Sequence, residues 1–425
     1  MSDCQFMRLA LSLARRGTGT ASPNPMVGAV LVKNGRIIGR GWHRRAGLPH
    51  AEIEALRDAQ KRGHNPRGAT LLVTLEPCCT HGRTPPCTDA IIAAGIKRVV
   101  VGATDPNPKH AGKGFKILRH AGLAVDWWGE RPREPLKPTT PGSRGRSPHQ
   151  QLANDCASLN EAFNHWIVRR TPFVTVKAAM TLDGKIATAS GESKWITGEK
   201  ARAHGMKLRR GSDAILVGVN TILADDPSLT ARSKNQDGVN IQHSTSDTQH
   251  PRLRRLVLDS RARTPLDAKV VSDEFAARTT IIVSKHAPKN RVAALAKRVN
   301  VLVAPPQKVG RASSRAGLSG ASPHQISLDW LLKKLGLENV TSLLVEGGGE
   351  VNASFLLGGL AQRVAFFYAP KILGGRDSRK GVAGEGVKSL SEVVQLREVE
   401  WRKLGDDLLL TARIDQTDIL PSFPA

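Results

Sequence analysis

Two short motifs constrain this chain more than any other feature. The first is His50-Ala51-Glu52, and the second begins at Glu76-Pro77-Cys78 and ends at Cys87. Together they supply an imidazole, two thiolates and a spare carboxylate. Such a set can hold a zinc ion through three protein ligands, leave one coordination position for water, and move that water's protons. We therefore expect His50, Cys78 and Cys87 to bind one Zn2+ per chain, and Glu52 to be the catalytic proton carrier.

The order of these residues resembles the signature of zinc-dependent base deaminases, in which His-x-Glu is followed by Pro-Cys and then by a second Cys. In that chemistry, water attacks the ring carbon that bears an amino group. Glu52 would carry the water's proton to a ring nitrogen and to the departing ammonia. The usual signature has a short Cys-x-x-Cys, whereas residues 79–86 separate Cys78 from Cys87 here. This longer spacing between the two thiols is itself a distinguishing feature of the motif.

Two other side chains of the same loop, Cys79 and His81, are also plausible ligands, because Cys78-x-x-His81 has a zinc-binding spacing. With either of them as a fourth protein ligand, the zinc ion would be structural. That alternative leaves the carboxylate of Glu52 without a purpose. We therefore favour Cys78, which follows a proline as in the signature, and Cys87, which precedes the next expected helix.

The size and charge of the chain narrow its class. A length of 425 residues predicts two domains. No apolar run reaches the length of about 18 residues that a membrane span needs, and five cysteines, mostly in one loop, predict free thiols in the cytoplasm. The net charge of +26 attracts anions, either nucleic acid or phosphate-bearing small molecules. Few aromatic residues are available to stack on bases, so we expect no nucleic-acid partner.

The first domain is expected at 1–130. It alternates strands and helices, which predicts an α/β sandwich with the metal-binding loops at strand ends. Asn34-Gly35 is a hairpin signal between two strands. The other expected elements are helices at 6–15, 50–62, 88–94 and 113–120 and strands at 69–75, 98–102 and 123–127.

Residues 131–156 are rich in Pro, Arg and Ser and predict a linker. The second domain is expected at 157–425, beginning with a helix. Polar stretches at 233–251 and 305–325 read as surface insertions. Its expected strands are at 173–179, 186–189, 214–217, 253–258, 279–283, 300–303, 341–345 and 363–368, with a helix at 199–209, which predicts another α/β domain.

A glycine turn follows one of these strands, at Gly347-Gly348-Gly349, and leads into a helix. Such a turn exposes backbone N–H groups and a helix N-terminus, which can bind a pyrophosphate. The sequence is not GxGxxG, so it does not predict a Rossmann fold. By residue type alone, nucleotide binding and a plain tight turn are equally good interpretations.

Several longer motifs now resemble one family, the bifunctional riboflavin-biosynthesis deaminase/reductases. In the first domain they are Asn24-Pro25-Met26-Val27-Gly28, Gly41-Trp42-His43, Pro49-His50-Ala51-Glu52, Thr74-Leu75-Glu76-Pro77-Cys78, Gly82-Arg83-Thr84-Pro85-Pro86-Cys87 and Asp105-Pro106-Asn107-Pro108. The resemblance implies a zinc deaminase domain with a cytidine-deaminase-like fold. It also implies that the substrate's pyrimidine and ribose phosphate are held by Asn24, His43, Arg83, Asp105 and Asn107. The two Asx-Pro pairs would also be turns in any protein, and Thr80 replaces a histidine that is frequent in the family.

The second domain resembles the family's reductase half, which has a dihydrofolate-reductase-like fold and uses NADPH. The matching motifs include Thr181-Leu182-Asp183-Gly184, Asp213-Ala214-Ile215 and Glu346-Gly347-Gly348. The residues implied to bind NADPH are Ala179, Trp195, Thr197, Thr221, Asp225, Gly347, Gly348 and Gly349. The residues implied to bind the substrate are Ser193, Arg209, Arg232 and Glu346, with arginine suited to bidentate phosphate contacts. Alternatively, Trp195 packs in the core and Asp225 belongs to a helix cap or turn.

The activity implied by the resemblance has two steps. The first is zinc-dependent hydrolytic deamination of 2,5-diamino-6-(5-phosphoribosylamino)pyrimidin-4(3H)-one. The second is NADPH-dependent reduction of the ribosyl group to give 5-amino-6-(5-phosphoribitylamino)uracil. We also expect a homo-oligomer. A nucleic-acid base deaminase with a basic binding domain is the alternative, and the long spacing between Cys78 and Cys87 disfavours it.

Overall fold

The computed structural model describes residues 1–82, 85–129, 147–231, 253–305 and 326–415. The chain divides into two compact units, Met1–Arg170 and Thr171–Ala425. Each unit has its own hydrophobic core. Within the described ranges, no helix is long and apolar enough to cross a bilayer.

A five-stranded sheet forms the centre of the first unit, in the order β2-β1-β3-β4-β5. The strands are β1 (Gly28–Lys33), β2 (Arg36–Trp42), β3 (Thr70–Val73), β4 (Arg98–Val101) and β5 (Ala124–Trp127). Strands β3, β4 and β5 are parallel, and β1 is antiparallel to both of its neighbours. The predicted hairpin joins β1 to β2, and its turn residues Asn34 and Gly35 both have positive φ angles, as a two-residue turn of this kind requires.

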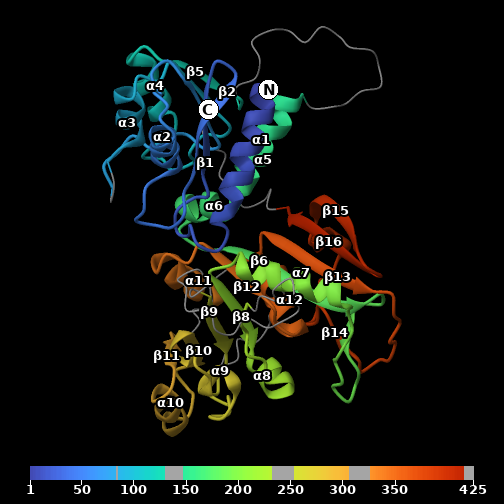
Figure 1. Ribbon diagram of the computed structural model, residues 1–425. Helices are drawn as coiled ribbons and strands as arrows, with labels where there is room; N and C mark the ends of the chain where they lie inside the picture. The colour runs from blue at the N-terminus through green and yellow to red at the C-terminus, as the bar shows by residue number, and fades with distance from the viewer. Residues whose placement is uncertain (83–84, 130–146, 232–252, 306–325, 416–425) are drawn as a thin grey trace. The chain divides into compact units, whose positions relative to one another are not determined.

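Helices cover both faces of this sheet (Figure 1). They are α1 (Asp3–Ala14), with a 3-10 turn at Arg15–Gly17, and α2 (Ala51–Lys61), α3 (Cys87–Ala93) and α4 (Lys113–His120). Close packing depends on glycines, because a Cβ on Gly28 would lie 2.0 Å from a backbone oxygen of α1, and one on Gly41 would lie 2.2 Å from a backbone oxygen of α2. The layers predicted for this domain are confirmed.

Two further helices belong to the first unit, α5 (Pro148–Leu159) and α6 (Glu161–Arg169). The sequence predicts the end of a linker and the start of the second domain in this segment. Instead, Leu152 and Cys156 are buried in the first core. The Asn160 side chain both donates to and accepts from the backbone of Met26, at 2.9 and 2.7 Å. The segment is mostly polar, so its few apolar residues, which pack against the first core, give only a weak signal in the sequence.

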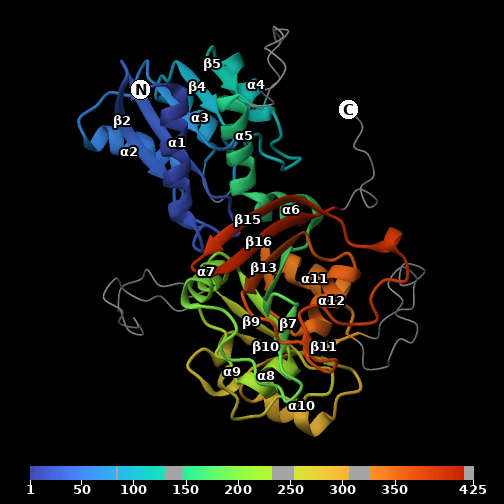
Figure 2. The same ribbon diagram turned by 90° about the vertical axis from the view of Figure 1, so that its right-hand side faces the viewer.

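A nine-stranded sheet forms the second unit, in the order β11-β10-β9-β8-β12-β6-β13-β16-β15 (Figure 2). The strands are β6 (Phe173–Thr181), β8 (Ala214–Gly218), β9 (Arg254–Leu258), β10 (Thr279–Ser284), β11 (Asn300–Ala304), β12 (Ser342–Val345), β13 (Arg363–Ala369), β15 (Leu396–Leu404) and β16 (Asp407–Ile414). The strands from β11 to β13 are parallel to their neighbours, and β16 and β15 complete the sheet in antiparallel fashion.

Short elements lie around this sheet. Strands β7 (Lys185–Ala187) and β14 (Arg379–Lys380) pair with each other. The helices are α7 (Glu199–Arg210), α8 (Val219–Asp225), α9 (Lys269–Ser272), α10 (Lys289–Ala296), α11 (Leu328–Leu337) and α12 (Gly349–Leu357), with 3-10 turns at Ala276–Arg278 and Leu390–Glu392. The predicted insertions lie, apart from Pro305, outside the described residues.

The C-terminal hairpin of β15 and β16 was not predicted. Residues of β15 are exposed almost throughout, whereas Leu409, Leu410 and Ala412 of β16 are buried. A strand at the edge of a sheet needs no apolar face of its own, so its sequence pattern is weak. Only its pairing with β16 reveals it.

Candidate active sites

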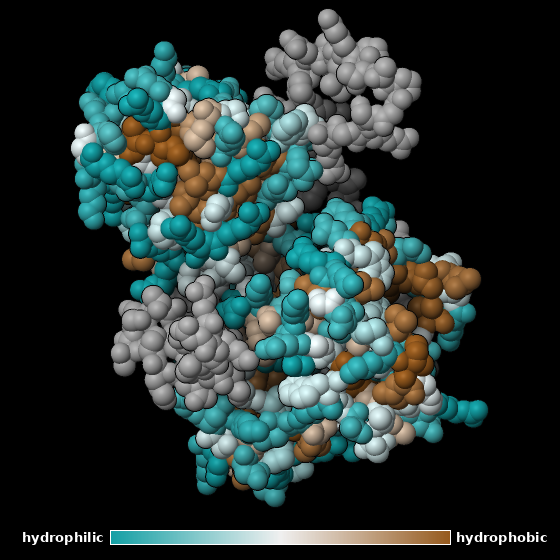
Figure 3. Space-filling model, turned by 45° about the vertical axis from the view of Figure 1, so that its right-hand side comes forward, coloured by the Kyte–Doolittle hydropathy of each residue, from teal (hydrophilic) through white to brown (hydrophobic). Residues whose placement is uncertain are grey.

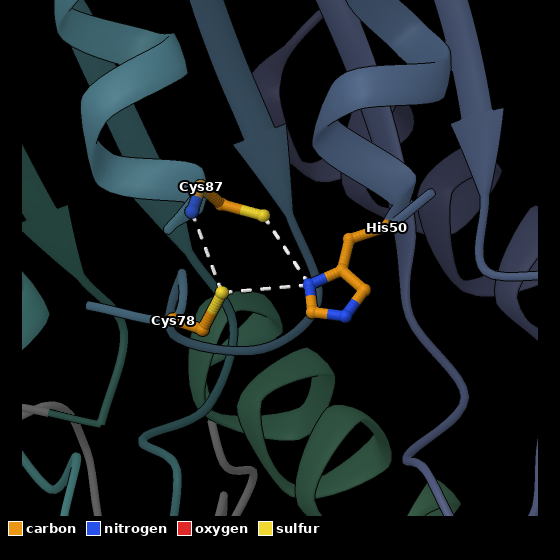
Figure 4. Close-up of side chains that lie close together, drawn as sticks. All are labelled: His50, Cys78 and Cys87. Carbon is orange, nitrogen blue, oxygen red and sulfur yellow. Dashed lines mark hydrogen bonds between the residues drawn. The ribbon is translucent and has the colours of Figure 1, made fainter. Parts of the chain in front are cut away.

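Three side chains that are distant in the sequence meet where α2 and α3 begin (Figure 4). His50 is the N-cap residue of α2, Cys87 is the first residue of α3, and Cys78 lies in the loop after β3. The Nδ1 atom of His50 lies 3.4 Å from Sγ of Cys78 and 3.3 Å from Sγ of Cys87. The backbone N–H of Cys87 donates to Sγ of Cys78 at 3.4 Å. One nitrogen and two sulfur atoms therefore face a common point.

These three donors fit a zinc ion. Their ligand atoms all lie within 4.8 Å of one another, and a tetrahedral ion with three protein ligands keeps a fourth position open. Within the described ranges, no other group of three or more His, Cys, Asp or Glu side chains is arranged to hold a metal. Hydrogen bonding with Cys87, and then with His50, outweighs burial and lowers the pKa of the Cys78 thiol to about 4, which favours the thiolate that a metal needs.

The alternative ligands Cys79 and His81 do not join this cluster. Sγ of Cys79 instead lies 3.7 Å from Nδ1 of His110, in the loop after β4. Burial, and then the charge of Glu76, raise the pKa of the Cys79 thiol. Among the residues that the structure describes, the geometry therefore gives no fourth protein ligand for a purely structural ion.

Glu52 lies in the first turn of α2, next to the cluster. Its side chain is only 3% exposed. Burial raises the pKa of Glu52 to about 7, and the positive charge of His50 opposes the shift. A carboxyl group with a pKa near neutrality can both accept and release a proton under physiological conditions. This is the property that a proton carrier needs.

The predicted substrate residues Asn24 and His43 lie together beside His50. Nδ2 of Asn24 is 3.1 Å from Nε2 of His43, and Nδ1 of His43 is 3.2 Å from the carbonyl oxygen of Pro49. The His43 ring packs edge-on against that of His50, with centroids 5.2 Å apart. Burial lowers the pKa of His43, so a neutral ring can donate from Nδ1 and accept from Asn24.

The other predicted substrate residues lie in the loop after β4. Oδ1 of Asp105 accepts from the backbone N–H of Asn107 at 2.9 Å, and Oδ1 of Asn107 accepts from that of Lys109 at 3.1 Å. The turn interpretation of these residues is therefore confirmed, while their contact with a substrate stays a prediction. Arg83 lies outside the described residues.

The second unit has a cavity of about 750 Å³ between α8, α12 and the β7–β14 pair. Four of the predicted cofactor residues line it: Thr221, Asp225, Gly348 and Gly349. The predicted substrate residue Ser193 also lines it, and its hydroxyl donates to Oδ1 of Asp225 at 3.1 Å. The cavity is large enough for an extended organic cofactor.

The glycine turn before α12 forms part of this cavity. A Cβ on Gly347 would lie 2.5 Å from Cβ of Val351, and one on Gly349 would lie 2.3 Å from the carbonyl oxygen of Lys380. Larger residues would therefore not fit. Gly348 is the N-cap residue of α12 and offers no side-chain cap, so the backbone N–H groups of the first turn are available to an anion.

The remaining predicted cofactor residues do not line the cavity. They are Ala179 of β6, Trp195, Thr197 and Gly347. Trp195 is 68% exposed, which excludes the core-packing alternative. Its indole lies under the guanidinium of Arg202, 4.6 Å from the ring centroid. Asp225 is the last residue of α8, so it both ends a helix and lines the cavity.

Glu346, Arg209 and Lys177 form a buried ionic group. The guanidinium of Arg209 donates two hydrogen bonds of 2.8 Å to the two oxygens of Glu346 and one of 3.0 Å to the carbonyl of Thr230. Nζ of Lys177 lies 3.5 Å from Oε2 of Glu346. Burial alone would raise the pKa of Glu346, but Lys177 and Arg209 lower it to about 2. Arg232 lies outside the described residues.

Sequence reasoning missed the pairing between Arg209 and Glu346, because each was assigned separately to the substrate. It also missed Arg379 and Lys380, which line the cavity. Their only local signal is a basic pair in a glycine-rich stretch, and the pairing of β14 with β7 brings them to the site.

Comparisons with known proteins agree with both units. Residues 1–103 match the cytidine and deoxycytidylate deaminase zinc-binding region, and residues 172–410 match the RibD C-terminal domain. The riboflavin biosynthesis protein RibD of Actinobacillus pleuropneumoniae is 40% identical over 410 residues, covering 96% of this chain and 95% of that protein. RibD of Escherichia coli strain K12 is 36% identical over 414 residues, covering 96% and 99%.

Solved structures give the same result. One form of Acinetobacter baumannii RibD has a TM-score of 0.74 at 32% identity and covers 97% of this chain and 99% of that one. A diaminohydroxyphosphoribosylaminopyrimidine deaminase/5-amino-6-(5-phosphoribosylamino)uracil reductase of Thermotoga maritima has a TM-score of 0.71 at 33% identity, with the same coverage. The two predicted fold types are confirmed. This chain thus belongs to the RibD family of riboflavin biosynthesis proteins, whose members join a zinc-binding deaminase domain to a reductase domain that uses NADPH.

Proposed function

We propose that the two units act in succession on one pyrimidine ribotide. We also propose that the residues predicted from the sequence bind the metal, cofactor and substrate and transfer the protons. The first unit removes an amino group from 2,5-diamino-6-(5-phosphoribosylamino)pyrimidin-4(3H)-one. The second reduces the ribosyl group to a ribityl chain, giving 5-amino-6-(5-phosphoribitylamino)uracil. The observation that carries the proposal is the cluster of His50, Cys78 and Cys87 beside the buried carboxyl of Glu52.

In the deaminase, His50, Cys78 and Cys87 hold the zinc ion. Zinc, when bound, lowers the pKa of a water molecule to about 7 and so supplies a nucleophile at neutral pH. Glu52 accepts one proton from the attacking water and delivers it to the ring nitrogen, and it then carries the second proton of that water to the departing amine. The C–N bond breaks, a C–O bond replaces it, and ammonia leaves. The ring and the ribose phosphate are held by Asn24, His43, Arg83, Asp105 and Asn107.

In the reductase, Thr221, Asp225 and the glycine turn 347–349 hold NADPH, with Ala179, Trp195 and Thr197 completing the site. The fit rests on the cavity volume and on the exposed N–H groups at the start of α12. NADPH supplies the hydride, so the chain mainly orients cofactor and sugar. Ser193, Arg209, Arg232 and Glu346 meet the substrate. Because the Nε and Nη2 groups of Arg209 already donate to the two carboxylate oxygens of Glu346, we expect the two side chains to contact the substrate together as an ion pair.

We also propose that the chain forms a homo-oligomer in the cytoplasm and needs no nucleic acid. Apolar side chains gather on parts of the surface (Figure 3). On the edge strand β15, Val399 is 47% and Trp401 60% exposed. An edge strand of this kind is a natural place for a second copy to pair. Light scattering measures the oligomeric state, and a monomer at micromolar concentration would reject this part of the proposal.

One experiment tests both activities. The zinc-loaded protein is incubated with the diaminopyrimidine ribotide, with and without NADPH, and the products are identified by mass spectrometry. Without NADPH, we expect ammonia and the deaminated ribosyl compound to appear. With NADPH, we expect the ribityl compound together with oxidation of the cofactor. Absence of ammonia in both arms would reject the deaminase assignment, and retardation of RNA at physiological salt would favour the nucleic-acid alternative.

A further inference from the structure

One buried carboxylate binds the loop that follows β4 at two places along the chain. Glu76, two residues before the ligand Cys78, is 3% exposed. Its Oε2 accepts hydrogen bonds from the backbone N–H of Asp105 at 3.3 Å and of Gly112 at 3.0 Å. Its Oε1 accepts from the N–H of Gly114 at 2.9 Å. Asp105 in the loop and the beginning of α4 are therefore bound to a single side chain.

Further contacts fix the start of α4 against the loop that contains Glu76. Gly112 is the N-cap residue of α4 and has no side-chain cap of its own, so the carboxylate of Glu76, in the loop after β3, takes over that role. A Cβ on Gly114 would lie 2.6 Å from the carbonyl oxygen of Pro77 and 3.1 Å from Oε1 of Glu76. The backbone N–H of Glu76 also donates to the carbonyl of Ala103 at 2.8 Å. The start of α4 thus packs directly against the strand end that leads to Cys78.

The loop held in this way contains Asp105 and Asn107. Its own turns are set by the Asp105 and Asn107 side chains, which accept from backbone N–H groups two residues ahead. At its far side, His110 lies 3.7 Å from Sγ of Cys79 and 3.4 Å from Oγ1 of Thr80. The conformation of the loop is therefore determined by hydrogen bonds within the loop itself. Its position relative to the metal-binding loop depends on Glu76 and, more weakly, on the exposed contact of His110.

We infer that Glu76 is a positioning residue for the deaminase: it sets the distance between the loop of Asp105 and Asn107 and the zinc ligand Cys78. The inference rests on the proposed function, because it assumes that Asp105 and Asn107 meet the substrate. Glu76 itself touches three backbone N–H groups and needs no contact with the reacting atoms. Its effect is therefore on substrate binding rather than on the proton transfer assigned to Glu52.

The first test is Glu76→Gln, which keeps the size of the side chain. A glutamine amide has one acceptor oxygen, and its NH2 group cannot accept from a backbone N–H. Either the bond from Gly114 or the pair from Asp105 and Gly112 is lost. We expect the KM of deamination to rise about ten-fold, the effect of losing one charge-assisted hydrogen bond, while kcat changes less than about two-fold.

A double-mutant cycle separates positioning from general damage. In an Asn107→Ala background the loop has already lost a substrate contact, so Glu76→Gln should add much less than in the wild type. Gly114→Ala provides an independent route to the same displacement and should also raise the KM. Zinc content should stay at one ion per chain in all of these variants. Glu54→Gln is the matched control, because Glu54 is a half-buried glutamate of α2 that pairs with Arg44 and Arg57, and it should leave the KM unchanged.

The outcomes are distinct. An unchanged KM in Glu76→Gln, or a fully additive cycle with Asn107→Ala, would overturn the inference. If Glu76→Gln does not fold, Gly114→Ala decides, and an unchanged KM there has the same meaning. Failure of the proposed function would look different, because the wild-type protein would then release no ammonia at all.

Discussion

Glu52 in the first unit and Glu346 in the second are both buried carboxyl groups, but their pKa values lie on opposite sides of the ordinary range. Burial raises the pKa of Glu52 to about 7, and the charge of His50 is the largest of the influences that oppose the shift. Burial acts on Glu346 in the same direction, yet Lys177 and Arg209 bring its pKa down to about 2. The difference lies in the cations that the fold places next to each carboxylate.

This difference separates two chemical roles. A carboxyl group that titrates near neutrality can move protons during a reaction. A carboxylate held ionised by two cations cannot do so, but it fixes the position of Arg209 and Lys177 in the second unit. We therefore propose that Glu52 acts as a reagent in the deaminase, and that Glu346 acts as an anchor for two cations in the second unit.

The largest expected effect comes from removing the reagent. In Glu52→Gln the side chain keeps its shape but can no longer carry a proton, so ammonia release should fall about a thousand-fold, equivalent to about 4 kcal/mol. Zinc content measured by mass spectrometry should be preserved, and so should the rate of NADPH oxidation when the deaminated ribosyl compound is supplied as the substrate. Deamination within ten-fold of the wild-type rate would remove Glu52 from proton transfer.

Removing the anchor should damage stability instead. Glu346→Gln leaves Arg209 and Lys177 buried without a counter-charge, which should cost the second unit about 3 kcal/mol of unfolding free energy. Proteolysis in increasing urea, with the fragments assigned to each unit by mass, measures this loss. Glu338→Gln is the matched control, because Glu338 makes comparable ion pairs with Arg254 and Lys334 at the surface. Equal losses in the two variants would contradict the anchor role.

The smallest effect concerns one of the two cations and the pH dependence of stability. A carboxylate whose pKa is lowered by folding stabilises the folded state at pH values above its pKa in the unfolded chain, which is about 4.5. This contribution disappears as the pH falls towards 2. Lys177→Met should raise the pKa of Glu346, cost about 1 kcal/mol at neutral pH, and shrink the acid-sensitive component. Urea denaturation at a series of pH values checks it. A profile identical to that of the wild type would show that Arg209 alone holds the charge.

Much of the first site could be predicted from the sequence. The three ligands and Glu52 sit in short motifs, and the turn at Asn34-Gly35 and most strands follow from local patterns. The docking of segment 148–169 on the first core and the hairpin of β15 and β16 could not be predicted, because their few apolar residues are meaningful only against the core or strand that they join. The carboxylate of Glu76 was visible in the motif, but its hydrogen-bond partners lie in another loop.

The sequence by itself determined the chemistry available to this protein. Two thiols, an imidazole and a carboxylate at that spacing specify a zinc-dependent deaminase, and the motifs of the second half specify a reductase. Only the tertiary structure decided how each acidic group behaves. Arg209 and Glu346 are 137 residues apart and share two hydrogen bonds, whereas no cation forms a comparable pair with Glu52 within the described ranges. A pKa depends on burial and on neighbouring charges, and both are set by segments far away along the chain.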